Sequence, residues 1–206
     1  MLVAIDGPVG AGKSTVARAV ARRLGFTYLD TGAMYRCVAL AAIDDEAADL
    51  ARRVAELRID FEGDRVLLDH SDVTELIRSP AVSQRASQVA ADPAVREALV
   101  DRQRRLTARG DWVAEGRDIG TVVRPDAELK VFLTATDEER AARRAAQTGR
   151  GVEEELADLR ERDERDRTRD ASPLRRAEDA IELDTTGLAF DAVVDRIAEL
   201  AREVPR

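Results

Sequence analysis

The sequence is poor in the residues that many catalytic and binding chemistries require. Among its 206 residues there is one cysteine, Cys37, and one histidine, His70. A single cysteine excludes an internal disulfide and favours a reducing compartment, so a cytoplasmic protein is expected, with Cys37 in the core. A single histidine argues against a His-rich metal site and a catalytic triad, and His70 is predicted to lie at the surface.

Aromatic residues make up only 3% of the chain, and no apolar run is long enough for a membrane span. The core is therefore expected to consist of alanine, valine, leucine and isoleucine. The first residues already form a strand pattern, so no signal peptide is expected. The formal net charge of −8 argues against nonspecific binding to nucleic acid or to an anionic membrane, because both need a basic face.

Lysine is nearly absent as well: two of the 33 basic residues are lysines, and the others are arginines. One of the two lies in the segment Gly7-Pro8-Val9-Gly10-Ala11-Gly12-Lys13-Ser14, which fits the G-x-x-x-x-G-K-[ST] pattern of a phosphate-binding loop. The flanks agree with this assignment. An apolar strand pattern, Leu2–Ile5, precedes the loop, and a helical pattern, Thr15–Leu24, follows it and stops at Gly25.

This order of strand, glycine-rich loop and helix predicts a nucleoside triphosphate site. The glycines permit backbone angles at which successive N–H groups surround an anion at a helix N-terminus. Lys13 is expected to reach the β- and γ-phosphates, and the Ser14 hydroxyl to bind Mg²⁺. The residues predicted to bind ATP are Gly7, Pro8, Val9, Gly10, Ala11, Gly12, Lys13, Ser14 and Thr15.

Four more apolar segments predict strands separated by helical patterns, at residues 27–29, 112–114, 129–133 and 180–183. Asp92 and Pro93 have the residue types that open a helix, which is expected to run towards Arg109. Thr136–Glu139 fits a capping box before another helix, and Phe190–Glu203 a closing amphipathic helix. The alternation predicts an α/β fold in a single domain, with a parallel sheet covered by helices on both faces.

One segment breaks this alternation. Arg58–Phe61 and Arg65–Asp69 are short strand-like runs joined by Gly63-Asp64, which predicts a small antiparallel hairpin. Two uses remain open for this insert. It is either a lobe that closes over a substrate or an element that only contributes packing.

Two polar segments, Asp30–Arg36 and Glu115–Thr121, follow directly after predicted strands. Ligands of open parallel sheets bind beyond the carboxyl ends of the strands, so both segments should face the crevice beside the phosphate-binding loop. Each combines glycine, a carboxylate, a hydroxyl and an arginine. One such segment is ordinary turn chemistry, but two at matching topological positions favour a binding site.

Residues Glu161–Arg169 form a dense run of charges. One interpretation is a solvated helix with ion pairs between residues four apart. The other is a ligand-binding face, because Arg162, Asp166 and Arg169 have the spacing of one helical side. Two arginines around one aspartate would suit a sugar and phosphates together. Pro173 limits how far this helix continues.

Five segments in this order resemble the bacterial cytidylate kinase family: Thr31–Arg36, Ala86–Ala90, Val95–Leu99, Gly116–Thr121 and Arg162–Arg169. The resemblance covers essentially the whole chain. It implies a P-loop nucleoside monophosphate kinase fold, in which helices flank a five-stranded parallel sheet. It also implies a division of the single kinase domain into a core over 1–35, 110–142 and 171–206, a monophosphate-binding lobe with the insert over 36–109, and a helical lid over 143–170.

The resemblance also implies roles for individual residues. Contacts to the cytosine base would come from Ser87, Arg96 and Asp118, and contacts to the acceptor phosphate from Arg36, Arg117 and Arg162. Asp166 would contact the ribose, and Arg169 would bridge towards the transferred phosphoryl group. Thr31 stands where the family often has serine, and its hydroxyl can serve the substrate equally well. The residues expected to act in catalysis are Lys13, Arg117, Arg162 and Arg169.

The reaction that this resemblance implies is transfer of the γ-phosphoryl group of ATP to CMP or dCMP in pyrimidine metabolism, with ATP and Mg²⁺ as cofactors, by a monomer. A phosphate oxyanion as acceptor needs no strong general base, which suits a chain with one histidine. Another small P-loop kinase, acting on a different monophosphate or a small metabolite, is the nearest alternative. A GTPase-type switch is disfavoured, because Lys130 lies in Glu128-Leu129-Lys130-Val131 and the Asn-Lys-x-Asp motif is absent.

Overall fold

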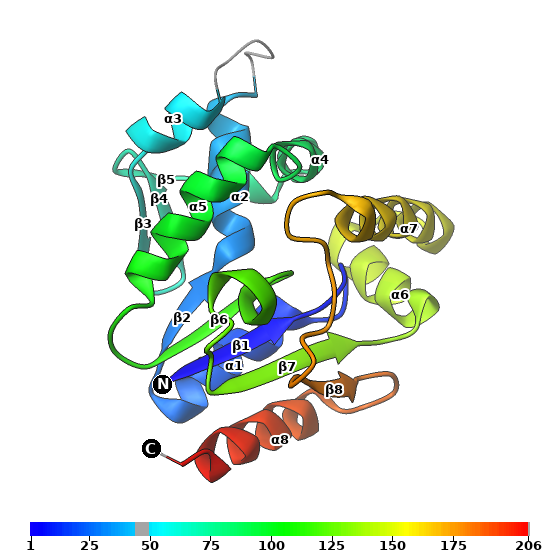
Figure 1. Cartoon of the computed structure of the whole chain (residues 1–206). Coiled ribbons are helices and arrows are strands. Elements are labelled where there is room, and N and C mark those ends of the chain that lie inside the picture. Colours follow the sequence, from blue (N-terminus) through cyan, green and yellow to red (C-terminus); the bar gives the residue numbers. More distant parts are fainter. Residues whose placement is uncertain (44–49, 206) are drawn as a thin grey trace. The chain divides into compact units, whose positions relative to one another are not determined.

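The computed structural model describes residues 1–43 and 50–205, and its chain forms two compact units. One unit contains Met1–Leu29 and Thr107–Arg206, and the other contains Asp30–Leu106. Figure 1 shows the elements of each unit. Within the described ranges, no helix is both long and apolar enough to cross a membrane.

A five-stranded parallel sheet forms the centre of the first unit. Its strands are Leu2–Asp6 (β1), Thr27–Asp30 (β2), Trp112–Gly116 (β6), Leu129–Thr134 (β7) and Ile181–Asp184 (β8), in the spatial order β2-β6-β1-β7-β8. Strand β1 lies in the middle, paired with β6 on one side and β7 on the other. Every residue of β1 is buried, which explains its continuous apolar run.

All five predicted strands are present, and each extends at least one residue further at its carboxyl end than predicted. The added residues include Asp6, Asp30 and Glu115, together with a glycine in β6. These residue types carry no apolar signal, so the pattern of hydrophobicity ends before the strand does. The consequence is that several carboxylates lie at the carboxyl edge of the sheet, where ligands of such folds bind.

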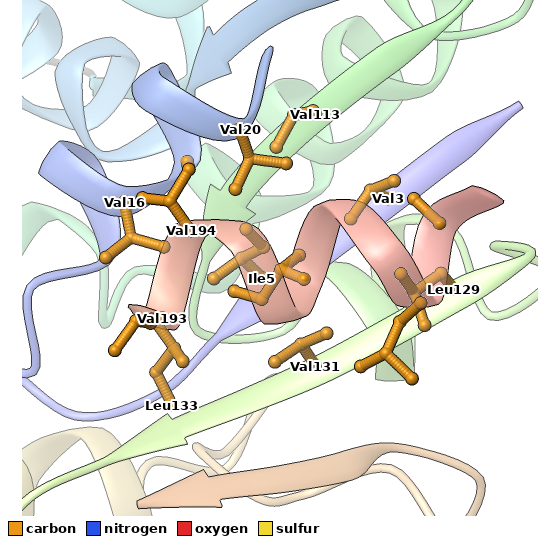
Figure 2. Packing of buried hydrophobic residues seen from close by; sticks show 14 of the residues in the cluster. Val3, Ile5, Val16, Val20, Val113, Leu129, Val131, Leu133, Val193 and Val194 are labelled. Atoms are coloured by element: carbon orange, nitrogen blue, oxygen red, sulfur yellow. The ribbon is translucent and has the colours of Figure 1, made fainter. Parts of the chain in front are cut away.

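Two helices, Lys13–Leu24 (α1) and Phe190–Glu203 (α8), cover one face of this sheet. Figure 2 shows valines from α1 and α8 packed against side chains of β1, β6 and β7. Helix α8 has the predicted bounds. Helix α1 begins at Lys13, two residues before its predicted start, and ends at Leu24 as predicted, with Gly25 as a left-handed C-cap. The core consists of valine, leucine, isoleucine and alanine, as expected for a chain with few aromatics.

A helical hairpin follows β7, made of Asp137–Thr148 (α6) and Val152–Thr168 (α7). The Thr136 hydroxyl accepts a hydrogen bond from the Glu139 N–H at 3.3 Å, as a capping box requires. The reciprocal bond of that box is absent, because the Thr136 N–H donates to the Thr186 hydroxyl at 3.0 Å and the Glu139 carboxylate pairs with Arg143. A short π-helix, Ile119–Val123, follows β6, and such turns often accompany functional sites.

The second unit is mostly helical. Its helices are Thr31–Ala41 (α2), Leu50–Glu56 (α3), the 3₁₀ turn Leu76–Arg78, Pro80–Val89 (α4) and Pro93–Leu106 (α5). Asp92 caps α5 by accepting hydrogen bonds from the N–H groups of Ala94 and Val95, which confirms the predicted start of this helix. The helix ends at Leu106, before Arg109. As expected, Cys37 is buried and His70 is exposed.

The predicted hairpin is present in this unit as Ile59–Glu62 (β3) and Arg65–Leu68 (β4), which pair antiparallel. A third strand, Ser71–Asp72 (β5), pairs with β4 and was not predicted, because two exposed polar residues carry no strand pattern. Arg102 of α5 donates hydrogen bonds to the carbonyl oxygens of Leu57 and Ile59, at 2.8 and 2.9 Å. The insert is thus anchored to a helix of its own unit.

Candidate active site

The loop between β1 and α1 has a conformation that suits glycine. Gly7, Gly10 and Gly12 have φ angles of 149°, 77° and 84°, which residues with a Cβ avoid. At Gly7 the restriction is also steric, because a Cβ would lie 2.1 Å from the carbonyl oxygen of Leu133 in β7. The loop leaves β1 in close contact with β7 and enters α1 at Lys13, which is the order that the sequence predicts.

Lys13 is 5% exposed, and its Nζ donates a hydrogen bond to the Pro8 carbonyl oxygen at 2.6 Å. Burial, together with the nearby positive charge of Arg117, lowers the pKa of Lys13 from 10.5 to about 7. Three carboxylates close enough to oppose this shift are those of Glu115, Asp163 and Asp166. The ammonium therefore lies in a confined polar centre, held by the loop's own backbone.

Ser14 and Thr15 follow Lys13 in the first turn of α1, and both are exposed. This turn contains no acidic residue, so no side chain within it repels an anion at the helix N-terminus. Among the residues that the structure describes, no three His, Cys, Asp or Glu side chains are grouped to hold a metal ion. A metal at this loop would therefore depend on few protein ligands.

The segment after β6 is fixed by a buried carboxylate at the end of β1. The two carboxylate oxygens of Asp6 accept the N–H groups of Ile119 and Gly120 at 2.9 and 2.8 Å. Burial raises the pKa of Asp6 from 3.8 to about 6, against the lowering effect of these two hydrogen bonds. Asp6 thereby joins the strand before the phosphate-binding loop to the segment that carries Arg117 and the buried Asp118.

Asp166 of α7 lies between two arginines that are distant in sequence. Its Oδ2 accepts a hydrogen bond from Arg117 Nε at 2.8 Å, and its Oδ1 lies 3.5 Å from Arg169 Nη1. Although burial alone raises the pKa of Asp166, the charges of Arg117, Arg169 and the half-buried Arg162 hold it below its ordinary value. The structure thus brings together four of the residues singled out in the sequence.

One detail of the predicted helical face is wrong. Arg162 and Asp166 lie in α7, but the helix ends at Thr168 and Arg169 has an extended backbone. The Asp166 carbonyl oxygen accepts the N–H of Leu174 at 2.7 Å, so the chain folds back where a longer helix would have continued. Arg169 reaches Asp166 from this turn, with its Nε bonded to the Ser172 carbonyl oxygen at 2.7 Å.

In the second unit, Asp30 organises the start of α2. One carboxylate oxygen accepts the Ala33 N–H at 2.8 Å, and the other pairs with Arg36 Nη2 at 2.8 Å. Thr31 is buried beside it. A Cβ at position 32 would lie 3.0 Å from the Arg36 guanidinium, so Gly32 leaves room for that side chain.

Arg96 of α5 is 3% exposed and is held by two neighbours in the second unit. Its guanidinium carbon lies 5.3 Å from the centre of the Tyr35 ring, and its Nη1 donates to the Ala90 carbonyl oxygen at 3.0 Å. Ser87 lies in α4 and is half-buried. Unit two therefore holds Thr31, Arg36, Ser87 and Arg96 on three helices.

The structure also reveals residues that the sequence analysis did not single out. Asp6 occupies the end of β1, next to the predicted loop, and a carboxylate directly after an apolar run is a signal that finds it. Asp30 belongs to a predicted segment but had no role of its own there. Arg140 and Asp163 are buried in α6 and α7 and contact the phosphate-binding loop at Val9. No sequence signal separates Asp163 from its charged neighbours, because the run shows no apolar face.

Comparison with known sequences points to one family. Residues 3–203 match a family model described as cytidylate kinase. A cytidylate kinase of Carboxydothermus hydrogenoformans is 49% identical, with 97% of this chain and 96% of that protein aligned. One from Pelotomaculum thermopropionicum is 52% identical, over 95% of this chain and 93% of that protein.

Solved structures agree on the fold. A shikimate kinase from Bacteroides thetaiotaomicron has a TM-score of 0.54 and 14% identity, with 98% of both chains covered. A gluconokinase from Sinorhizobium meliloti has a TM-score of 0.51 and 16% identity, covering 98% of this chain and 92% of that one. At these identities the likeness supports a shared P-loop kinase fold.

Proposed function

The chain belongs to the cytidylate kinase family, and we propose how its residues divide the transfer of the γ-phosphoryl group of ATP to CMP or dCMP. It is a phosphotransferase whose acceptor is itself a phosphate group. The products are ADP and CDP or dCDP. The acceptor arrives as an oxyanion, so catalysis consists of in-line positioning and charge neutralisation.

The donor set comprises residues Gly7 to Thr15, whose backbone and side chains bind the triphosphate of ATP. The positive φ angles of the loop glycines support this role, because they let N–H groups converge on an anion. Lys13 keeps its contact with the Pro8 carbonyl oxygen and directs its other two N–H groups to the β- and γ-phosphates. A phosphate is a stronger partner than a neutral carbonyl, and it restores the charge that burial disfavours.

Mg²⁺ fits this donor set. The cation prefers hard oxygen ligands and is commonly held by one or two protein groups, substrate phosphates and water. Ser14 offers an exposed hydroxyl in the first turn of α1, and Glu115 is a buried carboxylate close enough to influence Lys13. When bound, the metal neutralises charge on the phosphates, and Ser14 is the side chain that we assign to it.

The acceptor set holds CMP through charge at its phosphate and hydrogen bonds at its base. Arg36, Arg117 and Arg162 bind the phosphate, for which planar guanidinium groups are better suited than lysine. Ser87, Arg96 and Asp118 bind the cytosine, with Thr31 also in contact with the substrate. Asp166 contacts the ribose. Arg169 neutralises charge on the transferred group, and its anchoring to Asp166 and Ser172 supports this assignment.

We also assign residues 143–170 to a lid, 36–109 to a monophosphate-binding lobe and the remainder to the core. Arginines of a lid reach the reacting phosphates only when both substrates are bound, which limits hydrolysis of ATP. The enzyme is proposed to act as a monomer in a reducing cytoplasm, consistent with a buried, unpaired Cys37. Light scattering of the purified protein measures the oligomeric state directly.

The observation that carries this proposal is the match over residues 3–203 to one kinase family. Its test is a coupled assay of ADP release with CMP, dCMP, UMP, AMP, GMP and a small hydroxyl acceptor. CMP or dCMP is expected to give the highest kcat/KM. Faster turnover of any other acceptor would refute the assignment.

The same assay tests the base-binding residues. Asp118→Ala and Ser87→Ala should each lower kcat/KM for CMP by about 10- to 1000-fold, because a site built for hydrogen bonds is left with unpaired polar groups. The affinity for ATP should stay within about threefold of wild type. Asp126→Ala is the matched control, since the side chain of Asp126 is 70% exposed and forms an ion pair with Arg124, away from the proposed site. An equal loss of ATP affinity would contradict these roles.

A further inference from the structure

The buried pair of Arg140 in α6 and Asp163 in α7 has no assigned part in the reaction. Their side chains are 3% and 4% exposed, and Arg140 Nη1 donates to Asp163 Oδ2 at 2.6 Å. A buried ion pair is costly to desolvate, so its retention needs an explanation beyond stability.

The explanation lies in what the pair contacts. Asp163 Oδ1 accepts the N–H of Val9 at 3.1 Å, and Arg140 Nη1 donates to the carbonyl oxygen of the same residue at 2.7 Å. Val9 is the third residue of the phosphate-binding loop. Two consecutive peptide groups of that loop are therefore oriented by one ion pair, from two helices outside the loop.

The contact continues to Lys13 through a single peptide group. The N–H held by Asp163 and the Pro8 carbonyl oxygen belong to the same planar unit, and that oxygen accepts the hydrogen bond of Lys13 Nζ at 2.6 Å. Rotation of this peptide would move the position of the ammonium. Asp163 therefore acts on Lys13 through the backbone, by fixing the Pro8 carbonyl oxygen to which Lys13 is bonded.

Packing at the next residue leaves little room for the loop to shift. A Cβ at Gly10 would lie 3.1 Å from both the Cβ and the carbonyl oxygen of Arg140, and 3.4 Å from Leu159 of α7. Leu159 is 1% exposed. Gly10 thus packs closely against α6 at Arg140 and against α7 at Leu159, which lies one turn before Asp163.

We propose that the Arg140–Asp163 pair is a positioning device for phosphoryl transfer, which fixes the Pro8–Val9 peptide and, through it, Lys13. Because Asp163 neighbours Arg162 and lies one turn before Asp166, the same pair joins the donor loop to the helix that carries two proposed substrate-binding residues. This inference rests on the proposed function. Arg140 and Asp163 act through the loop and are not themselves expected to touch a substrate.

A second ion pair between the same helices provides a matched control. Glu155 of α7 is fully buried and accepts hydrogen bonds from Arg144 and Thr148 of α6, at 2.9 and 2.8 Å. None of its described hydrogen bonds reaches the phosphate-binding loop. Glu155→Gln therefore weakens the α6–α7 hairpin without altering the contacts at Val9.

The test compares Asp163→Asn, Arg140→Gln, Arg140→Lys and Glu155→Gln. Calorimetry with ATP and Mg²⁺, without an acceptor, gives the Kd, and the coupled assay gives kcat and KM. Asp163→Asn and Arg140→Gln should raise the Kd for ATP or lower kcat by roughly 10- to 100-fold, as for loss of a hydrogen bond to a charged group, with a smaller change in KM for CMP. Arg140→Lys keeps the charge and should recover part of this loss.

A second readout separates positioning from stability. Asp163 is one of the charges that favour the protonated form of Lys13, so Asp163→Asn should shift the pH dependence of ATP affinity to lower pH, whereas Glu155→Gln should leave it unchanged. Wild-type ATP affinity, kcat and pH dependence in Asp163→Asn and Arg140→Gln would overturn the proposal, as would equal losses in Glu155→Gln at a similar Tm. Failure of the wild-type enzyme to phosphorylate CMP would refute the proposed function instead, because ATP binding is measured without CMP.

Discussion

At the residue scale, the chemistry of the site depends on how differently lysine and arginine respond to burial. A guanidinium stays charged in the interior, so Arg117 keeps its charge beside Asp166. An ammonium readily loses its proton there, and Lys13 has its pKa lowered from 10.5 to about 7 by burial. The donor loop therefore carries a group whose charge depends on whether a phosphate is present, while the proposed acceptor residues carry permanent charge.

This difference predicts that ATP binding takes up protons. Between pH of about 7 and 10.5, the folded chain binds fewer protons at Lys13 than the unfolded chain does. The contribution of Lys13 to the free energy of unfolding therefore rises with pH in this window. Bound phosphates favour the ammonium and raise the pKa again. At pH 8, calorimetry in Tris and in HEPES should show uptake of up to about one proton per ATP, with affinity falling by up to about tenfold per pH unit above pH 7.

The control for this prediction is Lys13→Ala, which should bind ATP without that proton uptake and should slow phosphoryl transfer severely. Proton release, or the same uptake in Lys13→Ala, would show that another group titrates.

Asp6 is a separate case, because burial raises its pKa to about 6. Its contribution to the free energy of unfolding therefore changes only between pH of about 4 and 6. In that range the folded chain binds more protons than the unfolded chain, so this contribution falls as pH rises.

At the element scale, the phosphate-binding loop is shaped from both sides. Gly7 lies against the backbone of β7, and Gly10 lies against α6 and α7. The sequence predicted the strand, the loop and the helix, because glycine spacing and apolar periodicity are local signals. It did not predict what the loop rests on, since contacts with Leu133, Arg140 and Asp163 involve residues more than a hundred positions away. The sequence analysis also placed Arg169 in the helix. It was wrong there because the chain turns back after α7 through a backbone hydrogen bond from Leu174, which spacing does not reveal.

The two kinds of glycine restriction can be separated by mutation. Gly7→Ala should destabilise the fold by more than about 3 kcal/mol, because its Cβ would lie 2.1 Å from backbone that cannot move aside easily. Gly25→Ala is the matched control. Its φ is also positive, at 72°, but no atom lies within 4 Å of the added Cβ, so the cost should be about 1–2 kcal/mol. Urea denaturation measures both, and equal losses would mean that backbone strain alone restricts Gly7.

At the scale of the whole molecule, the chain forms two units whose boundary falls within continuous secondary structure. Strand β2 ends at Asp30 and α2 begins at Thr31, with Asp30 capping the helix. The sequence analysis anticipated the sheet, the insert and the proposed binding residues in each unit, from apolar patterns and the family resemblance. It could not anticipate the hydrogen bond of Ile119 to Asp6 or the pairing of Arg117 with Asp166, because such contacts arise only when distant segments meet.

One tryptophan and one cysteine report on these units separately. Trp112 lies in the first unit, and Cys37 is buried in the second, where burial raises the pKa of its thiol to about 12. Thiol reagents should therefore label Cys37 only after its unit opens. Because no residue separates β2 from α2, we expect Trp112 fluorescence and Cys37 labelling to give the same urea midpoint. Labelling that precedes the fluorescence change would show that the second unit unfolds on its own.

The scarcity of lysine also limits which side chains an amine-reactive reagent can modify. The neutral form of an amine is the nucleophile that attacks acylating and carbonyl reagents, and the lowered pKa of Lys13 supplies that form near pH 7. The Nζ of Lys130, the other lysine, is instead bonded to the Pro125 carbonyl oxygen at 2.6 Å and to Asp179 at 2.7 Å. An electrophile carried on a nucleotide would thus find one favoured side-chain amine in the chain, and its rate of modification would measure how much of the donor site is occupied by ATP.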